Sequence, residues 1–206
     1  DTMHQTIRRA LLSAPLLLLL CLGFWHHSEP RARAADPSIR PGKQEINAEI
    51  DDGLGLAITT VRQEVINTSG EACEASYELP IPDDAALLRF QVLAPALRPG
   101  EHAAARDRVE AMGRNLYRAT IHRVPGHGRG LLELTYAEAL ARRGRRRKYV
   151  YPLLAAGDAV ASRMSARIRI AARGVPEQVT CATHPMALRR PAPHVALLTY
   201  ESRQPP

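Results

Sequence analysis

The 206-residue sequence contains few of the residues that build catalytic or metal centres. It has three Cys and one Trp, and aromatic residues make up 4% of the chain. Three of its eight His lie in residues 1–34, and the other five are scattered with no Cys pair beside them, which argues against a zinc site. The G-x-S-x-G sequence of hydrolases and a phosphate-binding glycine loop are also absent. We therefore expect no cofactor and no metal, and we interpret the chain as non-enzymatic.

Positive charge is concentrated in one short stretch. The formal net charge is +7, and residues 142–148 hold enough cations to account for most of it. No aromatic residues are interleaved with these cations to stack on bases, so specific nucleic-acid binding is not expected. The stretch is either a solvated loop between two strands or a contact for polyanions, such as acidic surface polymers or anionic lipid headgroups. Its cations are Arg142, Arg143, Arg145, Arg146, Arg147 and Lys148.

The N-terminus has the pattern of a secretory signal peptide. Two Arg precede an apolar run at residues 10–25, and Ala32-Arg33-Ala34 follows as a small-residue cleavage site. The run is shorter than the roughly 20 residues that cross a bilayer, which argues against a membrane anchor. We expect residues 1–34 to be removed and the protein to be periplasmic, secreted or at the cell surface. It would be membrane-anchored if this leader stayed uncleaved.

Residues 55–92 give the clearest indication of fold class. Residues 56–66 are rich in Ile, Val and Thr, which favour strands. Turn-forming residues follow at 67–70, and residues 73–79 then alternate between apolar and polar side chains. Pro80 and Pro82 end this second strand. We predict an antiparallel hairpin from this strand–turn–strand pattern.

The remaining residues predict an all-β, antiparallel, sandwich-like single domain over residues 44–200. Residues 35–43 are expected to be a flexible lead-in, and Asp52-Gly53 a tight turn. Apolar residues at helical spacing between 105 and 116 predict one short helix. A turn is expected at 125–128, and residues 201–206 form a polar, Pro-rich tail. Further strands are predicted at 46–50, 117–124, 132–136, 148–153, 163–170, around 179–181 and at 197–200.

Two features of these strands suggest contacts. The strand at 163–170 alternates most regularly, and its outward row of Arg163, Arg167 and Arg169 is a plausible docking face, although a solvated sheet surface explains it more simply. Cys73 and Cys181 both point inward if their segments are strands. After export they could form a disulfide, or they could remain two separate buried thiols.

Several motifs together resemble the vault/inter-alpha-trypsin (VIT) domain. No single motif is specific, and the resemblance rests on their order over residues 44–199. The chain departs from the family pattern between Ala104 and Val124. The matching motifs are Asn67, then Tyr77-Glu78-Leu79-Pro80, then Asp84-Ala85 with Phe90, then Tyr136-Ala137-Glu138-Ala139-Leu140, and last Tyr151-Pro152-Leu153.

The resemblance implies a non-catalytic, β-rich interaction or scaffold module of a secreted or surface protein. Such modules are usually followed by a von Willebrand A-type domain, whose metal-site sequence Asp-x-Ser-x-Ser does not occur here. The chain is therefore expected to be a fragment or a stand-alone module that docks such a domain in cis or in trans. Two alternatives are a polyanion-binding module that uses residues 142–148, and a hydrolase that uses His122 or His127.

Overall fold

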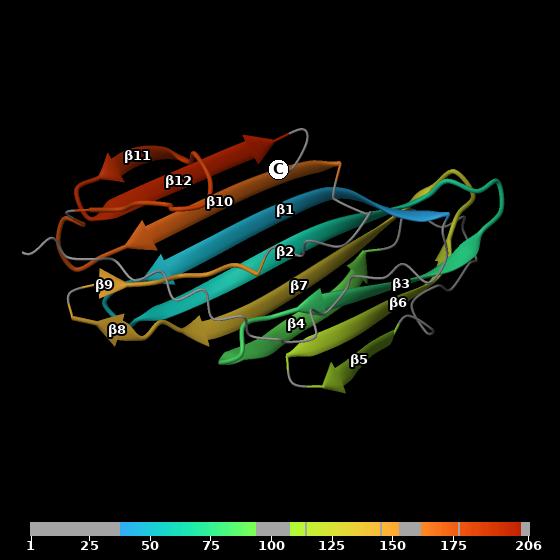
Figure 1. Cartoon of the computed structure of the whole chain (residues 1–206), viewed down its shortest axis with the longest axis horizontal. Helices are drawn as coiled ribbons and strands as arrows, with labels where there is room; N and C mark the ends of the chain where they lie inside the picture. The colour runs from blue at the N-terminus through green and yellow to red at the C-terminus, as the bar shows by residue number, and fades with distance from the viewer. Residues whose placement is uncertain are drawn as a thin grey trace, which may run out of the picture.

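The computed structural model describes residues 38–93, 108–113, 115–144, 146–152, 162–176 and 178–202, and they form an all-β protein (Figure 1). No helix occurs in these ranges, so none of them forms a helix that could cross a membrane. The larger sheet contains β1 (Ile39–Asp51), β2 (Leu56–Asn67), β4 (Ala85–Leu93), β7 (Arg129–Ala139), β10 (Arg163–Ala171), β11 (Ala187–Ala192) and β12 (Val195–Ser202). A smaller sheet contains β3 (Cys73–Pro80), β5 (Arg108–Gly113) and β6 (Leu116–Val124), and a separate hairpin contains β8 (Arg142–Arg143) and β9 (Arg146–Arg147).

The larger sheet has the strand order β11-β12-β10-β1-β2-β7-β4. Its pairings are antiparallel, as predicted, except that β1 and β10 run parallel from Lys43 opposite Arg163 to Asp51 opposite Ala171. The smaller sheet has the order β3-β6-β5 and is antiparallel throughout. The predicted all-β, mostly antiparallel and sandwich-like architecture is therefore confirmed.

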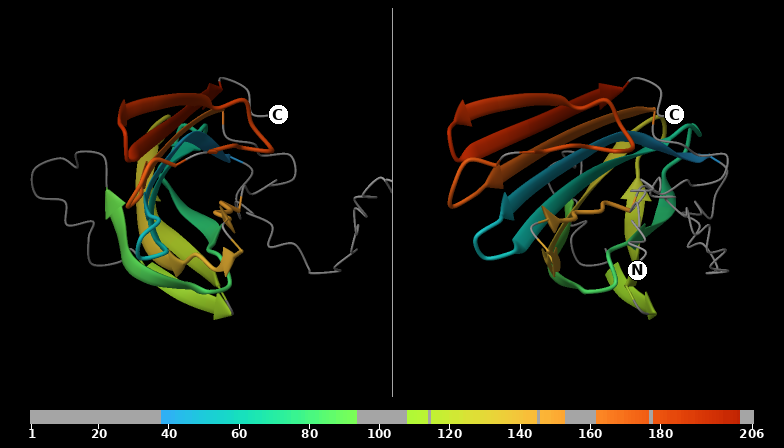
Figure 2. Two further views of the ribbon diagram at one scale, coloured as in Figure 1. Left: turned by 90° about the vertical axis from the view of Figure 1, so that its left-hand side faces the viewer. Right: turned by 60° about the vertical axis from the view of Figure 1, so that its left-hand side comes forward.

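The main hydrophobic core lies between the smaller sheet and the half of the larger sheet formed by β2, β7 and β4. The predicted alternation of β3 is confirmed, because Ala75, Tyr77 and Leu79 are buried in this core. Across from them, Leu134 and Tyr136 of β7 belong to the same cluster. Figure 2 shows β11 and β12 at the other end of the larger sheet, away from the smaller sheet.

A second, smaller apolar cluster lies at one end of β1 and β2. Ile50, Ala57 and Leu140 are buried there, and Ile168 and Ile170 of β10 pack against them while remaining partly exposed. The predicted inward direction of the apolar residues of β10 is therefore confirmed. The three-stranded sheet contributes no residue to this cluster. The inner face of the larger sheet therefore packs against the smaller sheet at β2, β7 and β4, but not at this second cluster.

The predicted hairpin between residues 56–66 and 73–79 is wrong. Both segments are strands, but β2 pairs with β1 and β7, whereas β3 pairs with β6 in the other sheet. The turn between them therefore connects the two layers of the sandwich. Alternation shows which side chains of a strand face the core, and both strands face the same core here from opposite sides.

The Asn67 side chain organises this connection. It is fully buried, and its Nδ2 donates to the carbonyl oxygens of Glu71 at 2.7 Å and Val124 at 3.1 Å. Its Oδ1 accepts from the backbone N–H of Ser69 at 2.9 Å and from the hydroxyl of Ser69 at 2.7 Å. The predicted turn chemistry is confirmed, because one amide satisfies backbone groups on both sides of the layer crossing.

The turn at residues 125–128 is also confirmed. The Gly128 N–H donates to the Pro125 carbonyl at 2.9 Å, and His127 has a positive φ of 52°. Gly126 lies against the backbone of Gly70, where a Cβ would collide with the carbonyl. This close approach brings the Asn67 turn and the β6–β7 turn together.

The predicted helix at 105–116 is wrong over its described residues. Residues 108–113 form β5, whose partner is β6, and Leu116 already belongs to β6. Gly113 has a φ of 154° and lies at the end of β5. The apolar spacing fits a helix, but the backbone hydrogen bonds to β6 decide the local structure.

Other boundaries also differ from the prediction. The lead-in is partly strand, because β1 begins at Ile39 and crosses an irregularity between Pro41 and Gln44. Residues 148–152 and 179–181 are not strands. Strands β4 and β11 were not predicted from the residue pattern. The leader at 1–34 and most of the tail at 201–206 lie outside the described residues.

Candidate functional site

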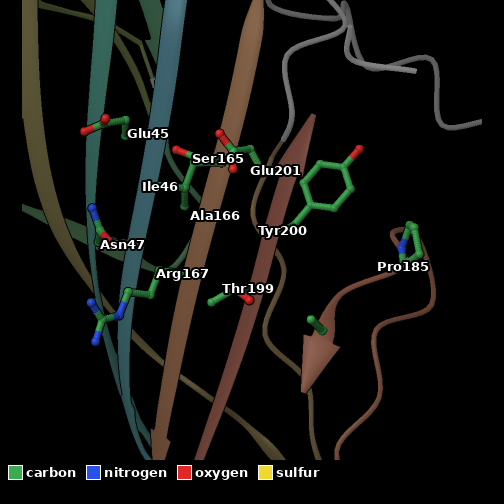
Figure 3. A pocket seen from close by; sticks show the side chains of 11 residues that line it. Glu45, Ile46, Asn47, Ser165, Ala166, Arg167, Pro185, Thr199, Tyr200 and Glu201 are labelled. Atoms are coloured by element: carbon green, nitrogen blue, oxygen red, sulfur yellow. The ribbon is translucent and has the colours of Figure 1, made fainter. Parts of the chain in front are cut away.

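A groove of about 640 Å³ lies over β1, β10 and β12, on the face of the larger sheet that points away from the core. Figure 3 shows the side chains that line it. Of the residues that line it, Ile46, Ala166 and Tyr200 form one register row in which the Ile46 side chain is buried, so the side chains of the rows on either side point outward. The floor consists of two cross-strand rows, Glu45–Ser165–Glu201 and Asn47–Arg167–Thr199.

The outward arginines of β10 differ in their partners. Arg163 forms an ion pair with Glu201 on β12, and Arg169 pairs with Glu49 on β1 at 3.2 Å. Arg167 is exposed and has neutral cross-strand neighbours, and no carboxylate among the described residues pairs with it. The predicted outward row is therefore present, and its middle member is the arginine that lines the groove.

A loop closes the groove on the side of β11. Pro185 and Tyr200 line this side, and Figure 3 shows both at the edge of the groove near β12. The Tyr200 ring also makes an edge-to-face contact with His184, with ring centroids 4.9 Å apart. Thr183 Oγ1 lies 2.9 Å from His184 Nδ1 and links the ring to its own loop.

Cys73 and Cys181, for which a disulfide and two separate thiols were both considered, are free thiols in this structure. Cys73 is half-buried at the start of β3, but Cys181 is exposed and lies outside any strand, so its predicted inward position is wrong. Burial opposes ionisation of Cys181, but hydrogen bonds from the Thr183 side chain and from the backbone N–H groups of Thr183 and His184 lower its pKa.

The stretch expected to be a loop between two strands contains a short hairpin of its own, β8 and β9, with Arg142 opposite Arg147 and Arg143 opposite Arg146. Arg143, Arg146 and Lys148 are exposed, and the Arg142 Nε donates to the Gly144 carbonyl at 3.0 Å. Arg145 lies outside the described residues. The hairpin therefore presents several cations to solvent, as a polyanion contact would require.

Arg147 instead has a structural role. Its Nη1 donates to the Leu140 carbonyl at 2.7 Å, and its Nε lies 3.1 Å from both Oδ1 and the carbonyl oxygen of Asp52. These bonds attach the hairpin to the turn between β1 and β2. That turn spans residues 52–55, which include the predicted Asp52-Gly53 turn, and has a positive φ at Gly55.

The histidines considered for catalysis lie in different places. His122 on β6 is exposed, with its Nδ1 3.7 Å from Glu74 Oε2. His127 lies in the β6–β7 turn, and His184 precedes β11 in the other sheet. Among the described residues, no group of three or more His, Cys, Asp and Glu side chains is placed to hold a metal ion.

A buried polar cluster was not anticipated from the sequence. The hydroxyls of Thr59 and Tyr149 lie 2.9 Å apart, and burial raises the pKa of Tyr149 to about 12. No hydrogen bond from the described residues reaches the Tyr136 hydroxyl or Oε1 of Glu138, although both residues are buried. Burial raises the pKa of Glu138 to about 7. In the sequence, Glu138 follows Leu132, Leu134 and Tyr136, which point inward from β7 at two-residue spacing. This spacing could have indicated that Glu138 also points inward.

No family model matches this sequence, and no curated protein matches it. Among solved structures, it is similar to a protein described as nutrient-binding from Legionella pneumophila, with a TM-score of 0.55 and 10% identity over 84% of this chain and 66% of that chain. An M1 zinc metallopeptidase from Deinococcus radiodurans has a TM-score of 0.47 and 12% identity, over 83% of this chain and 39% of that chain. The chain thus spans less than two thirds of the length of either protein. At 10% identity the first similarity shows only a shared fold. With a TM-score below 0.5, the second supports no conclusion about this chain.

Proposed function

We propose that this chain is a non-catalytic interaction module of an exported or surface-associated protein, and that it docks a partner domain. The observation that carries the proposal is the open groove over β1, β10 and β12. Its floor is a flat sheet face with polar side chains from three strands, which resembles the polar composition of a transient protein interface. The proposed location outside the cytoplasm rests on the pattern of residues 1–34.

The proposal that the module is VIT-like gains support from where the motif residues lie. Tyr77, Leu79 and Tyr136 are buried in the main core, and Phe90 and Tyr151 pack against it. Motifs far apart in the sequence therefore meet in one cluster between the two sheets. This is the arrangement expected of residues that specify a fold, and it leaves the outer face of β1, β10 and β12 to determine the partner.

The proposed partner is a von Willebrand A-type domain, encoded in the same polypeptide or separately. The test is biolayer interferometry with the full chain immobilised and a purified A-type domain from the same genome in solution. We expect saturable, micromolar binding that the soluble chain competes away. Ser165→Trp should weaken the binding at least about tenfold, because Ser165 lies in the groove floor and a Trp side chain would fill it.

Arg143→Trp is the matched control, because it adds the same side chain at an exposed position of the hairpin. It should leave the affinity unchanged. Absence of binding at 100 times the expected dissociation constant would rule out the proposed partner. Equal losses for the two Trp variants would show that docking does not use the groove.

A second candidate function is contact with a polyanion through the β8–β9 hairpin. The observation that favours it is the exposure of Arg143, Arg146 and Lys148 on one short hairpin. Anionic polymers or lipid headgroups would bind there through charge and counterion release, so the contact would be weak and sensitive to salt.

A further inference from the structure

Arg167 is placed differently from the other two arginines of its row. Each of the others has an acidic partner on a neighbouring strand, Glu201 for Arg163 and Glu49 for Arg169. In the register row of Arg167, the neighbouring strands instead supply the neutral residues Asn47 and Thr199. The sheet thus leaves an exposed guanidinium in the groove floor without a counter-charge from the described residues.

We propose that the groove binds an extended segment of the docking partner, neutral except for one Asp or Glu whose carboxylate pairs with Arg167. This inference rests on the proposed docking function and names the chemistry of the partner. The planar guanidinium of Arg offers a two-donor fork that matches a carboxylate. Three adjacent strands, about 5 Å apart, give a floor that three or four extended residues can cross.

The neighbouring row explains why a single carboxylate fits better than a polyanion. Glu45 and Glu201 line the groove two residues along their strands from the Arg167 row, at a spacing of about 7 Å. Their carboxylates, although paired with Lys43 and Arg163, would repel further negative charge. A highly charged ligand is therefore better suited to the β8–β9 hairpin, where no acid is interleaved with the arginines.

Neutral groups in the floor suit the rest of such a segment. Asn47 offers an amide, and Ser165 and Thr199 offer hydroxyls, so all three can both donate and accept hydrogen bonds. Pro185 and Ala187 add apolar surface at the side of β11. The groove therefore combines one charge contact with several neutral polar contacts and an apolar edge.

The test is a titration of the ¹⁵N-labelled chain with capped heptapeptides of Ser and Thr that carry one central Glu, one central Gln, or three Glu residues. We expect the single-Glu peptide to shift the amide signals of residues in the groove floor. It should bind about three to ten times more tightly than the Gln peptide, as a partly exposed charge contact allows. Arg167→Gln should abolish this preference, and Arg167→Lys should restore only part of it.

Arg143→Gln is the matched control and should keep the preference, because it removes an exposed arginine outside the groove. Equal binding of the Glu and Gln peptides, or an unchanged preference in Arg167→Gln, would overturn the inference. Tighter binding of the three-Glu peptide or of inorganic phosphate in the groove, measured from the amide signals of the groove floor, would overturn it in favour of a general anion site. If the A-type domain binds in the interferometry test but no peptide shifts the groove, the docking function stands and this inference falls.

Discussion

The two halves of the seven-stranded sheet differ in what lies against them. The half formed by β2, β7 and β4 is covered by the three-stranded sheet, and residues such as Val61 and Tyr136 are buried between the layers. In the half formed by β1, β10, β12 and β11, inward residues such as Ile46 and Leu198 are also buried, but Ile168 and Ile170 of β10 are only partly buried, and none of these belongs to the main core cluster. The outer face of this second half carries paired charges and the groove.

The difference separates the residues that hold the fold together from those available for recognition. The motifs that resemble the VIT domain contain apolar residues of the covered half, the one formed by β2, β7 and β4, and of the sheet that covers it. These motifs therefore identify core residues. The open half contains the groove, and its outward side chains contribute little packing. Substitutions in the two halves should therefore have different consequences, and the following predictions test that difference.

The largest effect is expected from Leu134→Ala in the covered half. Leu134 is 2% exposed in the main core, and removing a buried leucine side chain costs about 2–5 kcal/mol of unfolding free energy. The matched variant is Leu188→Ala on β11, where the leucine is 42% exposed and the loss should stay below about 1 kcal/mol. Urea denaturation followed by circular dichroism measures both. Similar losses would show that the open half is packed as tightly as the covered half.

The next effect concerns the buried carboxyl of Glu138 on the inner side of β7. Its pKa in the folded state is raised to about 7, so the unfolded chain releases this proton at lower pH than the folded chain. Stability should therefore fall as pH rises from about 4.5 to 7, by about 2–3 kcal/mol, and stay lower above pH 7. Glu138→Gln should remove this loss and stabilise the protein at pH 8.

Glu133 on the outer side of the same strand is the contrasting control. Its carboxylate accepts from Arg62 Nε at 2.6 Å and from Gln91 Nε2 at 2.7 Å. Glu133→Gln removes a paired charge and should destabilise the protein. Unfolding curves at pH 5, 7 and 8 compare the variants, and a Glu138→Gln protein that is less stable than the original at pH 8 would contradict the expected burial cost.

Alternation predicted several elements of the fold because it reports directly on which side chains face a core. It correctly predicted the inward faces of β3 and β10, and turn chemistry correctly predicted the roles of Asn67 and residues 125–128. These features depend on residues close together in the sequence. Local side-chain preferences are sufficient to specify them.

Strand partners could not be obtained in this way. The period-two pattern is the same whether β2 pairs with β3 or with β7, and nothing local indicates that β1 pairs in parallel with β10. The apolar spacing at 105–116 fits a helix, but neighbouring β6 makes residues 108–113 a strand. The sequence predicted the outward arginines of β10. That no carboxylate among the described residues pairs with Arg167 depends on its register with Asn47 and Thr199.

The smallest stability effects are expected in the β8–β9 hairpin. Arg146 is exposed, and Arg146→Ser should change the unfolding free energy by less than about 0.5 kcal/mol. Arg147→Ser should cost about 1 kcal/mol, because it removes hydrogen bonds to Leu140 and Asp52. Retention on a heparin column should show the opposite order. The Arg146→Ser variant should elute at lower salt than the original chain, because Arg146 is exposed to the column ligand. The Arg147→Ser variant should elute closer to the original chain, because the Arg147 guanidinium is already bonded to Leu140 and Asp52. If both variants elute like the original chain, the hairpin cations do not contact polyanions and the β8–β9 hairpin is a solvated turn.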